Sequence, residues 1–292
     1  MPLQNFEWNE AIDFEPNDPR IAALIVLVAI GPDRRPQPIG SGFVIHANGK
    51  NAVAMTAAHN IAGIHDVQAP RPSHHASTAL PEFLPPRVPL SLDVKDVFAV
   101  CIEAGGSIEV AEICACAADD QADVATLFLR SRNPDSKFFR SHYEVDDALP
   151  EIGAEVCIVG FSDLQIIDPQ ENGTFQIGHR VLFRIGKVAE HYLDGHIFCR
   201  GPCVETSIPV FGGVSGGIVI RHTPGAKMRV FGLVCSDPED TLENKLNRAV
   251  SGRTIAALLG VKIRGEKDGR QLFDLTINNG QITKNPEWDG II

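Results

Sequence analysis

Short apolar runs separated by turn-forming residues dominate the chain. Stretches rich in Val, Ile, Leu and Phe alternate with Gly, Pro, Asn and Asp, whereas the spacing of an amphipathic helix is scarce. Short runs of this kind are typical of β-strands. The pattern predicts strands at Ala22–Ile30, Gly40–His46, Ala52–Thr56, Val97–Glu103, Ser107–Cys116, Val124–Arg130, Glu155–Phe161, Val181–Glu190, Ile197–Cys199, Gly217–Arg221, Arg229–Cys235 and Asn247–Val250.

Glycine and proline mark the connections between these runs. Ala104–Gly106 indicates a hairpin turn, and Asn48-Gly49 within His46–Lys50 indicates another, because Asn-Gly suits positions that need a positive φ. Between Gln68 and Leu92 proline is too dense for regular structure, which predicts a long loop.

A short helix and a tail are expected near the C-terminus. Ser251 can cap a helix that stops at Gly260. The apolar face of this helix is Ile255, Leu258 and Leu259. Residues Val261–Ile292 then indicate an appended hairpin and tail.

Composition changes this picture by excluding other classes of protein. The 292 residues, 44% hydrophobic and 22% charged, fit one large or two small globular domains and exclude global disorder. A net charge of −11 argues against nucleic-acid binding, which usually needs a basic face. The chain start lacks a secretory pattern, and the longest apolar run, Ile21–Ile30, is too short to span a membrane. We therefore expect a cytoplasmic protein whose seven cysteines are thiols.

Three short stretches carry residues suited to hydrolysis. Met55–His59 ends an apolar strand with a histidine, Ala122–Leu127 places Asp123 before an apolar run, and Gly212–Gly217 surrounds Ser215 with glycines. A serine that cleaves peptide bonds needs an imidazole to take its proton and a carboxylate to orient that imidazole. Flanking glycines let the backbone turn sharply and aim N–H groups at the developing oxyanion.

The order His, Asp, Ser along the chain resembles the chymotrypsin-like (trypsin-fold) serine peptidases, and differs from the orders of subtilisins and α/β-hydrolases. Further stretches within Ile21–Gly260 are similar to this family, most of all to its HtrA-type and bacterial trypsin-like members. These stretches are Gly40–Ile45, Glu155–Phe161, Gly232–Ser236 and Arg248–Val250.

The resemblance implies an all-β fold of two antiparallel Greek-key β-barrels with a short C-terminal helix and tail. Residues 1–150 then hold an N-terminal segment and the first barrel with His59 and Asp123. Residues 151–260 hold the second barrel with Ser215, and residues 261–292 form an extension in which no PDZ-like domain is expected.

By the same resemblance, Ser215 is the nucleophile, His59 the general base and then acid, and Asp123 the orienting carboxylate. The backbone N–H groups of Gly213 and Ser215 form the oxyanion hole. No metal and no organic cofactor is expected.

The residues expected to bind substrate follow from the same comparison. Pro209 takes the place of the pocket floor, so that no acid is there to bind Arg or Lys. Its neighbours Ile208 and Val210 favour a small or aliphatic residue before the scissile bond, while Asp237, Glu239 and Asp240 favour a basic one as the alternative. The substrate main chain is expected to pair with the sheet edge at Cys235, Ser236 and Asp237.

Two departures from the family pattern bear on regulation. Val214 precedes the nucleophile where classical trypsins have an aspartate, which suggests that activation does not use a freed N-terminus. Ala58 and Asn60 flank His59, so the family's disulfide beside the histidine is absent.

Several residues have alternative interpretations. Asp120 competes with Asp123, although only Asp123 directly precedes the apolar run. Cys199 and Cys203, with His191 and His196 nearby, allow a zinc site as the alternative to buried thiols flanking a strand. Cys114 and Cys116, two apart on one strand, are expected to point the same way as small core residues. His74-His75 in the proline-rich loop is expected to be a solvated pair.

The expected function is therefore a serine endopeptidase acting on protein or peptide substrates, without contacts to nucleic acid or membrane. A regulatory protein partner, with residues 70–90 or the tail as a gate, is a hypothesis that rests on their position and length. A partner-gated protease that is inactive in isolation, and a non-catalytic binding module on the same fold, are the alternatives.

Overall fold

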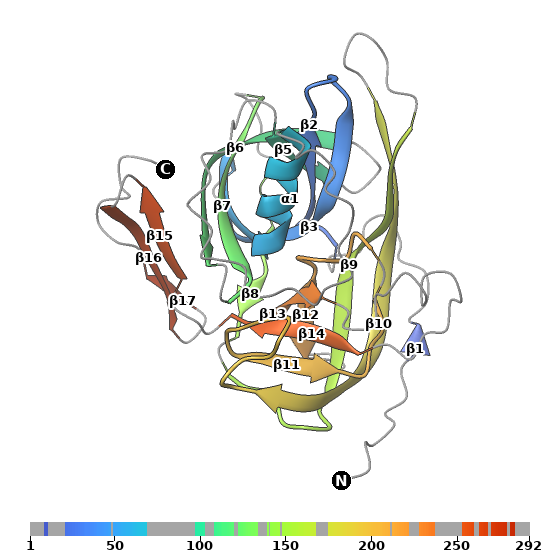
Figure 1. The fold of residues 1–292 in the computed structure, drawn as a ribbon, viewed down its shortest axis with the longest axis vertical. Helices are drawn as coiled ribbons and strands as arrows, with labels where there is room; N and C mark the ends of the chain where they lie inside the picture. Colours follow the sequence, from blue (N-terminus) through green and yellow to red (C-terminus); the bar gives the residue numbers. More distant parts are fainter. Residues whose placement is uncertain are drawn as a thin grey trace, which may run out of the picture.

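Two closed β-barrels make up most of the molecule (Figure 1). The computed structural model describes residues 9–10, 21–47, 49–68, 97–102, 108–119, 122–133, 139, 141–146, 148–167, 175–210, 212–221, 228–236, 253–259, 263–267, 270–278 and 281–283. In this part of the chain no helix has the length and apolar character needed to cross a membrane.

The first barrel is an antiparallel ring in the order β2-β3-β4-β7-β6-β5. Its strands are β2 (Leu24–Ile30), β3 (Pro36–Ala47), β4 (Asn51–Ala57), β5 (Val97–Ile102), β6 (Ile108–Asp119) and β7 (Val124–Ser131). Phe43, Met55 and Leu127 are fully buried side chains of these strands.

The second barrel repeats this ring order as β9-β10-β11-β14-β13-β12, closed by pairing of β10 with β9. Its strands are β9 (Glu155–Ile167), β10 (Gln176–Tyr192), β11 (Cys203–Thr206), β12 (Ile218–Arg221), β13 (Arg229–Ser236) and β14 (Thr254–Leu258). Two short strands flank it: β1 (Asn9–Glu10) pairs with β10, and β8 (Glu144–Val145) pairs with β13. In each ring the first three strands are followed by the sixth, fifth and fourth, so the expected trypsin-like double barrel is confirmed.

The predicted C-terminal helix is wrong. Thr254–Leu258 is strand β14, which lies between β11 and β13 and completes the second barrel. Ile255, Ala256 and Ala257 are all buried, so both faces of the strand are covered. A strand buried on both faces is a continuous apolar run, which residue spacing does not distinguish from a short helix. The predicted cap, Ser251, lies outside the described residues.

A helix that the sequence pattern did not indicate is present instead. Helix α1 (Ala58–Gln68) follows β4 directly and lies against the first barrel (Figure 1). Ile61 and Ile64 form its buried side. With two such apolar positions in a run of small and polar residues, the periodicity is too weak to be detected from the sequence.

Most other predicted strands in the described residues are confirmed within a few residues. The exception is Ile197–Cys199, which forms only an isolated bridge between His196 and Cys199. Strands β1, β8 and β11 were not predicted. The extension contains β15 (Ile263–Lys267), β16 (Arg270–Asn278) and β17 (Gln281–Thr283), which form a small sheet beside β6 and β7 (Figure 1). The strand Asn247–Val250, the hairpin Ala104–Gly106, Asn48, and all of the proline-rich loop after Gln68 lie outside the described residues.

The expectation that Cys114 and Cys116 are core residues is wrong for Cys114 and holds in part for Cys116, which packs against the hydrophobic core. Cys114 is exposed and Cys116 is half-buried on β6, whose register shifts between Ile113 and Ala115. The core positions of this strand are Ala111 and Ile113. Burial nevertheless raises the pKa of the Cys116 thiol to about 11.

Ser41 on β3 joins the two barrels. Its N–H donates to the Ser215 carbonyl at 2.9 Å, and its hydroxyl donates to the Gly213 carbonyl at 2.7 Å. The same hydroxyl accepts from the N–H of Phe161 on β9 at 2.9 Å. Because Ser41 is fully buried, water cannot replace these partners.

We expect Ser41→Ala to lower the free energy of unfolding by about 2–4 kcal/mol, because it leaves the half-buried Gly213 carbonyl and the buried Phe161 N–H without their partner. Thr126→Val is the matched control. Thr126 Oγ1 is buried without a hydrogen-bond partner among the described residues, so its removal should be neutral or stabilising by about 1 kcal/mol. Urea unfolding of both variants measures the two effects; equal losses would contradict this account of the junction.

Candidate active site

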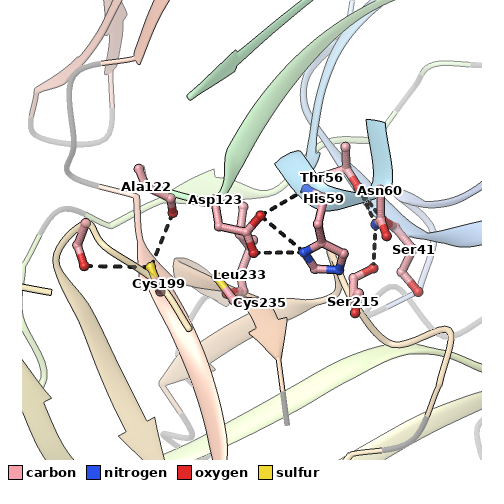
Figure 2. Close-up of polar contacts among 11 residues, drawn as sticks. Ser41, Thr56, His59, Asn60, Ala122, Asp123, Cys199, Ser215, Leu233 and Cys235 are labelled. Atoms are coloured by element: carbon pink, nitrogen blue, oxygen red, sulfur yellow. Dashed lines mark hydrogen bonds and ion pairs between the residues drawn. The ribbon is translucent and has the colours of Figure 1, made fainter. Parts of the chain in front are cut away.

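His59 and Asp123 are brought together by the first barrel (Figure 2). His59 lies in the first turn of α1, and Asp123 lies in the connection between β6 and β7. The Nδ1 atom of the imidazole is 2.9 Å from Asp123 Oδ2 and 3.1 Å from Oδ1. The carboxylate therefore holds Nδ1 as the protonated nitrogen and leaves Nε2 free to act as a base.

Asp123 also caps helix α1. The N–H of His59 donates to Asp123 Oδ1 at 3.0 Å, and the N–H of Ala58 donates to the Asp123 carbonyl at 3.1 Å. These N–H groups are among those that a helix leaves without an internal acceptor. Asp123 has a φ of 52°, a left-handed conformation that aspartate tolerates better than most residues. The same residue thus fixes both the backbone and the ring of His59.

The two side chains differ in their exposure to solvent. The side chain of His59 is 44% exposed and that of Asp123 only 12%. The imidazole is open to a bound molecule, while the carboxylate is sheltered from water, which strengthens its interaction with the ring. The competing Asp120 lies outside the described residues, and Asp119 accepts the Ala122 N–H at 3.0 Å.

Ser215 comes from the second barrel and lies beside the free edge of the His59 ring (Figure 2). Its carbonyl accepts from Ser41 N–H at 2.9 Å and from Asn60 Nδ2 at 3.0 Å, so two residues of the first barrel hold it. The turn also needs glycine at 216, which has a φ of 82°. A Cβ there would be 2.1 Å from the Ser41 carbonyl oxygen.

The turn before Ser215 leaves two N–H groups available. The Gly213 carbonyl is bound by the Ser41 hydroxyl, and the Val214 carbonyl accepts from Gly217 N–H at 2.7 Å. Neither the Gly213 nor the Ser215 N–H donates to an acceptor in the described part of the chain. Two unused donors beside a serine can stabilise a developing negative charge on oxygen.

Most of the residues expected to bind substrate that the structure describes are buried. Pro209 is buried and its carbonyl accepts from the buried Arg184 at 2.6 Å. Val210 and Cys235 are also buried. The backbone of Ser236 ends β13, and Asp237 lies outside the described residues.

A polar network beneath the three predicted residues was missed by sequence reasoning. Asn60 is buried, and its Nδ2 also donates to Thr56 Oγ1 at 2.9 Å; Thr56 Oγ1 in turn donates to the Ser41 carbonyl at 2.7 Å. The only signal in the sequence was the adjacency of Thr56 and Asn60 to the histidine motif. No pattern in the sequence connected Thr56 and Asn60 with Ser41 or with the Ser215 carbonyl.

A second contact between the barrels involves Ala122, the residue before Asp123. The turn Cys199–Cys203 of the second barrel packs on Ala122, where Cys199 Sγ lies 3.4 Å from the Ala122 carbonyl oxygen (Figure 2). Gly201 approaches Ala122 so closely that a Cβ at 201 would be 2.7 Å from the Ala122 Cα. The backbone next to Asp123 is therefore positioned by this turn.

The zinc alternative for this turn gains no support from the surrounding histidines. His191 Nε2 lies 2.8 Å from the Pro150 carbonyl oxygen, and the His196 ring packs on Tyr192 at 4.7 Å between centroids. Within the described ranges, no three His, Cys, Asp or Glu side chains are arranged to hold a metal ion. Cys199 and Cys203 are buried thiols, as expected.

Several solved structures have a similar course of the chain. They include Deg5, at 13% identity over 81% of this chain and 84% of that one, with a TM-score of 0.43. Human heparin binding protein has 14% identity over 86% of this chain and 90% of that one, with a TM-score of 0.46. A third is neuropsin, a serine protease expressed in the limbic system of mouse brain, at 11% identity over 87% of this chain and 94% of that one, with a TM-score of 0.46. No family model and no curated protein matches the chain. At these identities and TM-scores, the fold assignment rests on the strand order of the two rings.

We expect Gly201→Ala to weaken the hydrogen bond between His59 and Asp123, because the added methyl group displaces Ala122. The low-field proton resonance of His59 Nδ1 should move upfield or broaden, with a loss of about 1–3 kcal/mol in stability. The control is Gly63→Ala in α1, where the nearest atom to a Cβ is Ile39 Cγ2 at 3.5 Å. An unchanged resonance in Gly201→Ala would show that this turn does not position Asp123.

Proposed function

We propose that the protein is a serine endopeptidase in which Ser215, His59 and Asp123 act as a catalytic triad. The observation that carries the proposal is the His59–Asp123 contact at 2.9 Å, formed on the first barrel and facing Ser215 on the second. The carboxylate fixes the tautomer in which Nε2 can take a proton from the serine hydroxyl.

The proposed reaction has two stages that use the same residues. His59 Nε2 accepts the Ser215 proton as Oγ attacks the peptide carbonyl, and Asp123 stabilises the imidazolium that forms. The N–H groups of Gly213 and Ser215 bind the oxyanion. His59 then protonates the leaving amine, and a water molecule hydrolyses the acyl-enzyme by the same route in reverse.

The proposed substrate is a peptide segment in extended conformation. Ser236 at the end of β13 pairs with Ile255 of β14 on one side, and Cys235 lies at a shift in this register. On the other side of this strand end a peptide can add main-chain hydrogen bonds. Buried Ile208 and Val210 beside Pro209 favour a small or aliphatic residue before the scissile bond. Specificity for this residue can be read from a peptide library after activity is established.

Labelling with a fluorescent fluorophosphonate tests the proposal. Wild type should be labelled and Ser215→Ala should not, because the probe phosphonylates only an activated serine next to an oxyanion hole. Circular dichroism controls for folding of both proteins. No labelling of folded wild type, alone or after addition of cell extract, would favour the non-catalytic binding module; labelling only with extract would favour the partner-gated protease.

Asp123→Asn separates orientation from folding. The amide oxygen can still accept the His59 N–H that caps α1, while the amide NH₂ facing Nδ1 enforces the wrong imidazole tautomer. We expect kcat for a peptide substrate to fall about 10⁴-fold with little change in the melting temperature. A loss below about tenfold, measured by steady-state kinetics on folded protein, would contradict the role of Asp123.

A further inference from the structure

Three buried thiols meet behind Asp123, and the proposed mechanism does not use them as reacting groups. Cys199 follows the bridge to His196, Cys203 begins β11, and Cys235 lies near the end of β13. All three are less than 3% exposed. The Cys199 sulfur accepts hydrogen bonds from the thiols of both Cys203 and Cys235. Thiols from β11 and β13 of the second barrel are thus both hydrogen-bonded to the Cys199 sulfur.

The environment distinguishes the three sulfur atoms chemically. Hydrogen bonds donated by Cys203 and then Cys235 lower the pKa of Cys199. The pKa of Cys203 is raised by its hydrogen bond to Cys199 and by burial, and that of Cys235 is raised chiefly by burial. The thiolate is the nucleophilic form of cysteine, so Cys199 is the member of the cluster that reacts first with an oxidant.

Cys199 directly follows an exposed part of the surface. Ile197 and Phe198, the two residues before it, are 83% and 43% exposed. Cys199 and Cys203 are four residues apart around the turn that contains Gly201, and Cys203 Sγ lies 3.7 Å from the Cys199 carbonyl oxygen. A disulfide between them closes a short loop that is already formed, so little chain entropy is lost.

We infer that Cys199 and Cys203 form a reversible disulfide that changes the position of Asp123, and that this turn is an oxidation-sensitive modification site. The inference that activity responds rests on the proposed function. An S–S bond of about 2.05 Å draws the two sulfur atoms well inside their hydrogen-bonded separation. Cys199 Sγ then leaves the Ala122 carbonyl, and Gly201, already packed against Ala122, must move with the turn.

The oxidant considered is a hydroperoxide. The Cys199 thiolate attacks one peroxide oxygen, the O–O bond breaks, and the departing hydroxide takes up a proton to become water, leaving a sulfenic acid. The Cys203 sulfur gives up its proton and attacks the sulfenic sulfur; the S–O bond breaks, and hydroxide leaves with that proton as water. Two thiols lose two electrons and two protons, and one hydrogen peroxide is reduced to two waters.

The test treats folded protein with hydrogen peroxide, blocks remaining thiols, and maps peptides without reduction. We expect a Cys199–Cys203 disulfide, a shift of the low-field His59 Nδ1 proton resonance, and a fall of about tenfold or more in fluorophosphonate labelling rate, all reversed by dithiothreitol. A disulfide between Cys199 and Cys235, or no disulfide, would overturn the assignment. So would a disulfide that leaves the resonance in place.

Matched variants make the result specific to this pair. In Cys203→Ser, and in Cys203→Ala as a second replacement, the ratio of oxidised to reduced labelling rate should approach one. In Cys114→Ser, which removes an exposed thiol on β6, the ratio should equal that of wild type. If reduced wild type is never labelled, the proposed function fails, while the peptide map and the His59 resonance still decide the modification site.

Discussion

The hydrogen bonds of Ser41 are the contact on which the rest of the site depends. Each barrel alone supplies an incomplete site, because His59 and Asp123 belong to the first and Ser215 to the second. Ser41 binds the carbonyls of Gly213 and Ser215 and the N–H of Phe161. While Ser41 binds these carbonyls, the N–H groups of Gly213 and Ser215 have no acceptor within the described part of the chain. The junction between the barrels therefore positions the turn that carries Ser215 as well as joining the barrels.

Asp123 fixes both the start of helix α1 and the orientation of the His59 ring. Helix α1 begins where its first N–H groups meet the Asp123 carboxylate and carbonyl, so the helix start depends on a residue 64 positions away. The imidazole meets the same carboxylate through Nδ1. A shift of Asp123 consequently moves the helix end and the ring together, which keeps their geometry matched but makes the site sensitive to whatever packs behind Asp123.

Most barrel strands and the three candidate residues could be proposed from the sequence, because each depends on local patterns. Alternating apolar runs mark strands, and the histidine, aspartate and serine each lie in a short motif whose order along the chain is informative. Prediction from the sequence failed where tertiary contacts determine the secondary structure. The apolar spacing of β14 is also compatible with a helix, and only its pairing with β11 and β13 identifies it as a strand. Helix α1 was missed because its sequence is only weakly amphipathic. Ser41, Asn60 and Gly201 act through partners far away in the chain, which spacing does not reveal.

The two barrels contact each other at both ends of the candidate triad, and the two contacts differ in strength. At the serine end, Ser41 and Asn60 of the first barrel hold the Ser215 carbonyl of the second. At the aspartate end, the Cys199–Cys203 turn of the second barrel packs on Ala122 of the first. The first contact is built from several hydrogen bonds between buried groups, whereas the second depends on van der Waals contact and one weak thiol donor. We therefore expect a displacement between the barrels to change the aspartate end first, where it would alter the orientation of the imidazole before it disturbs the serine turn.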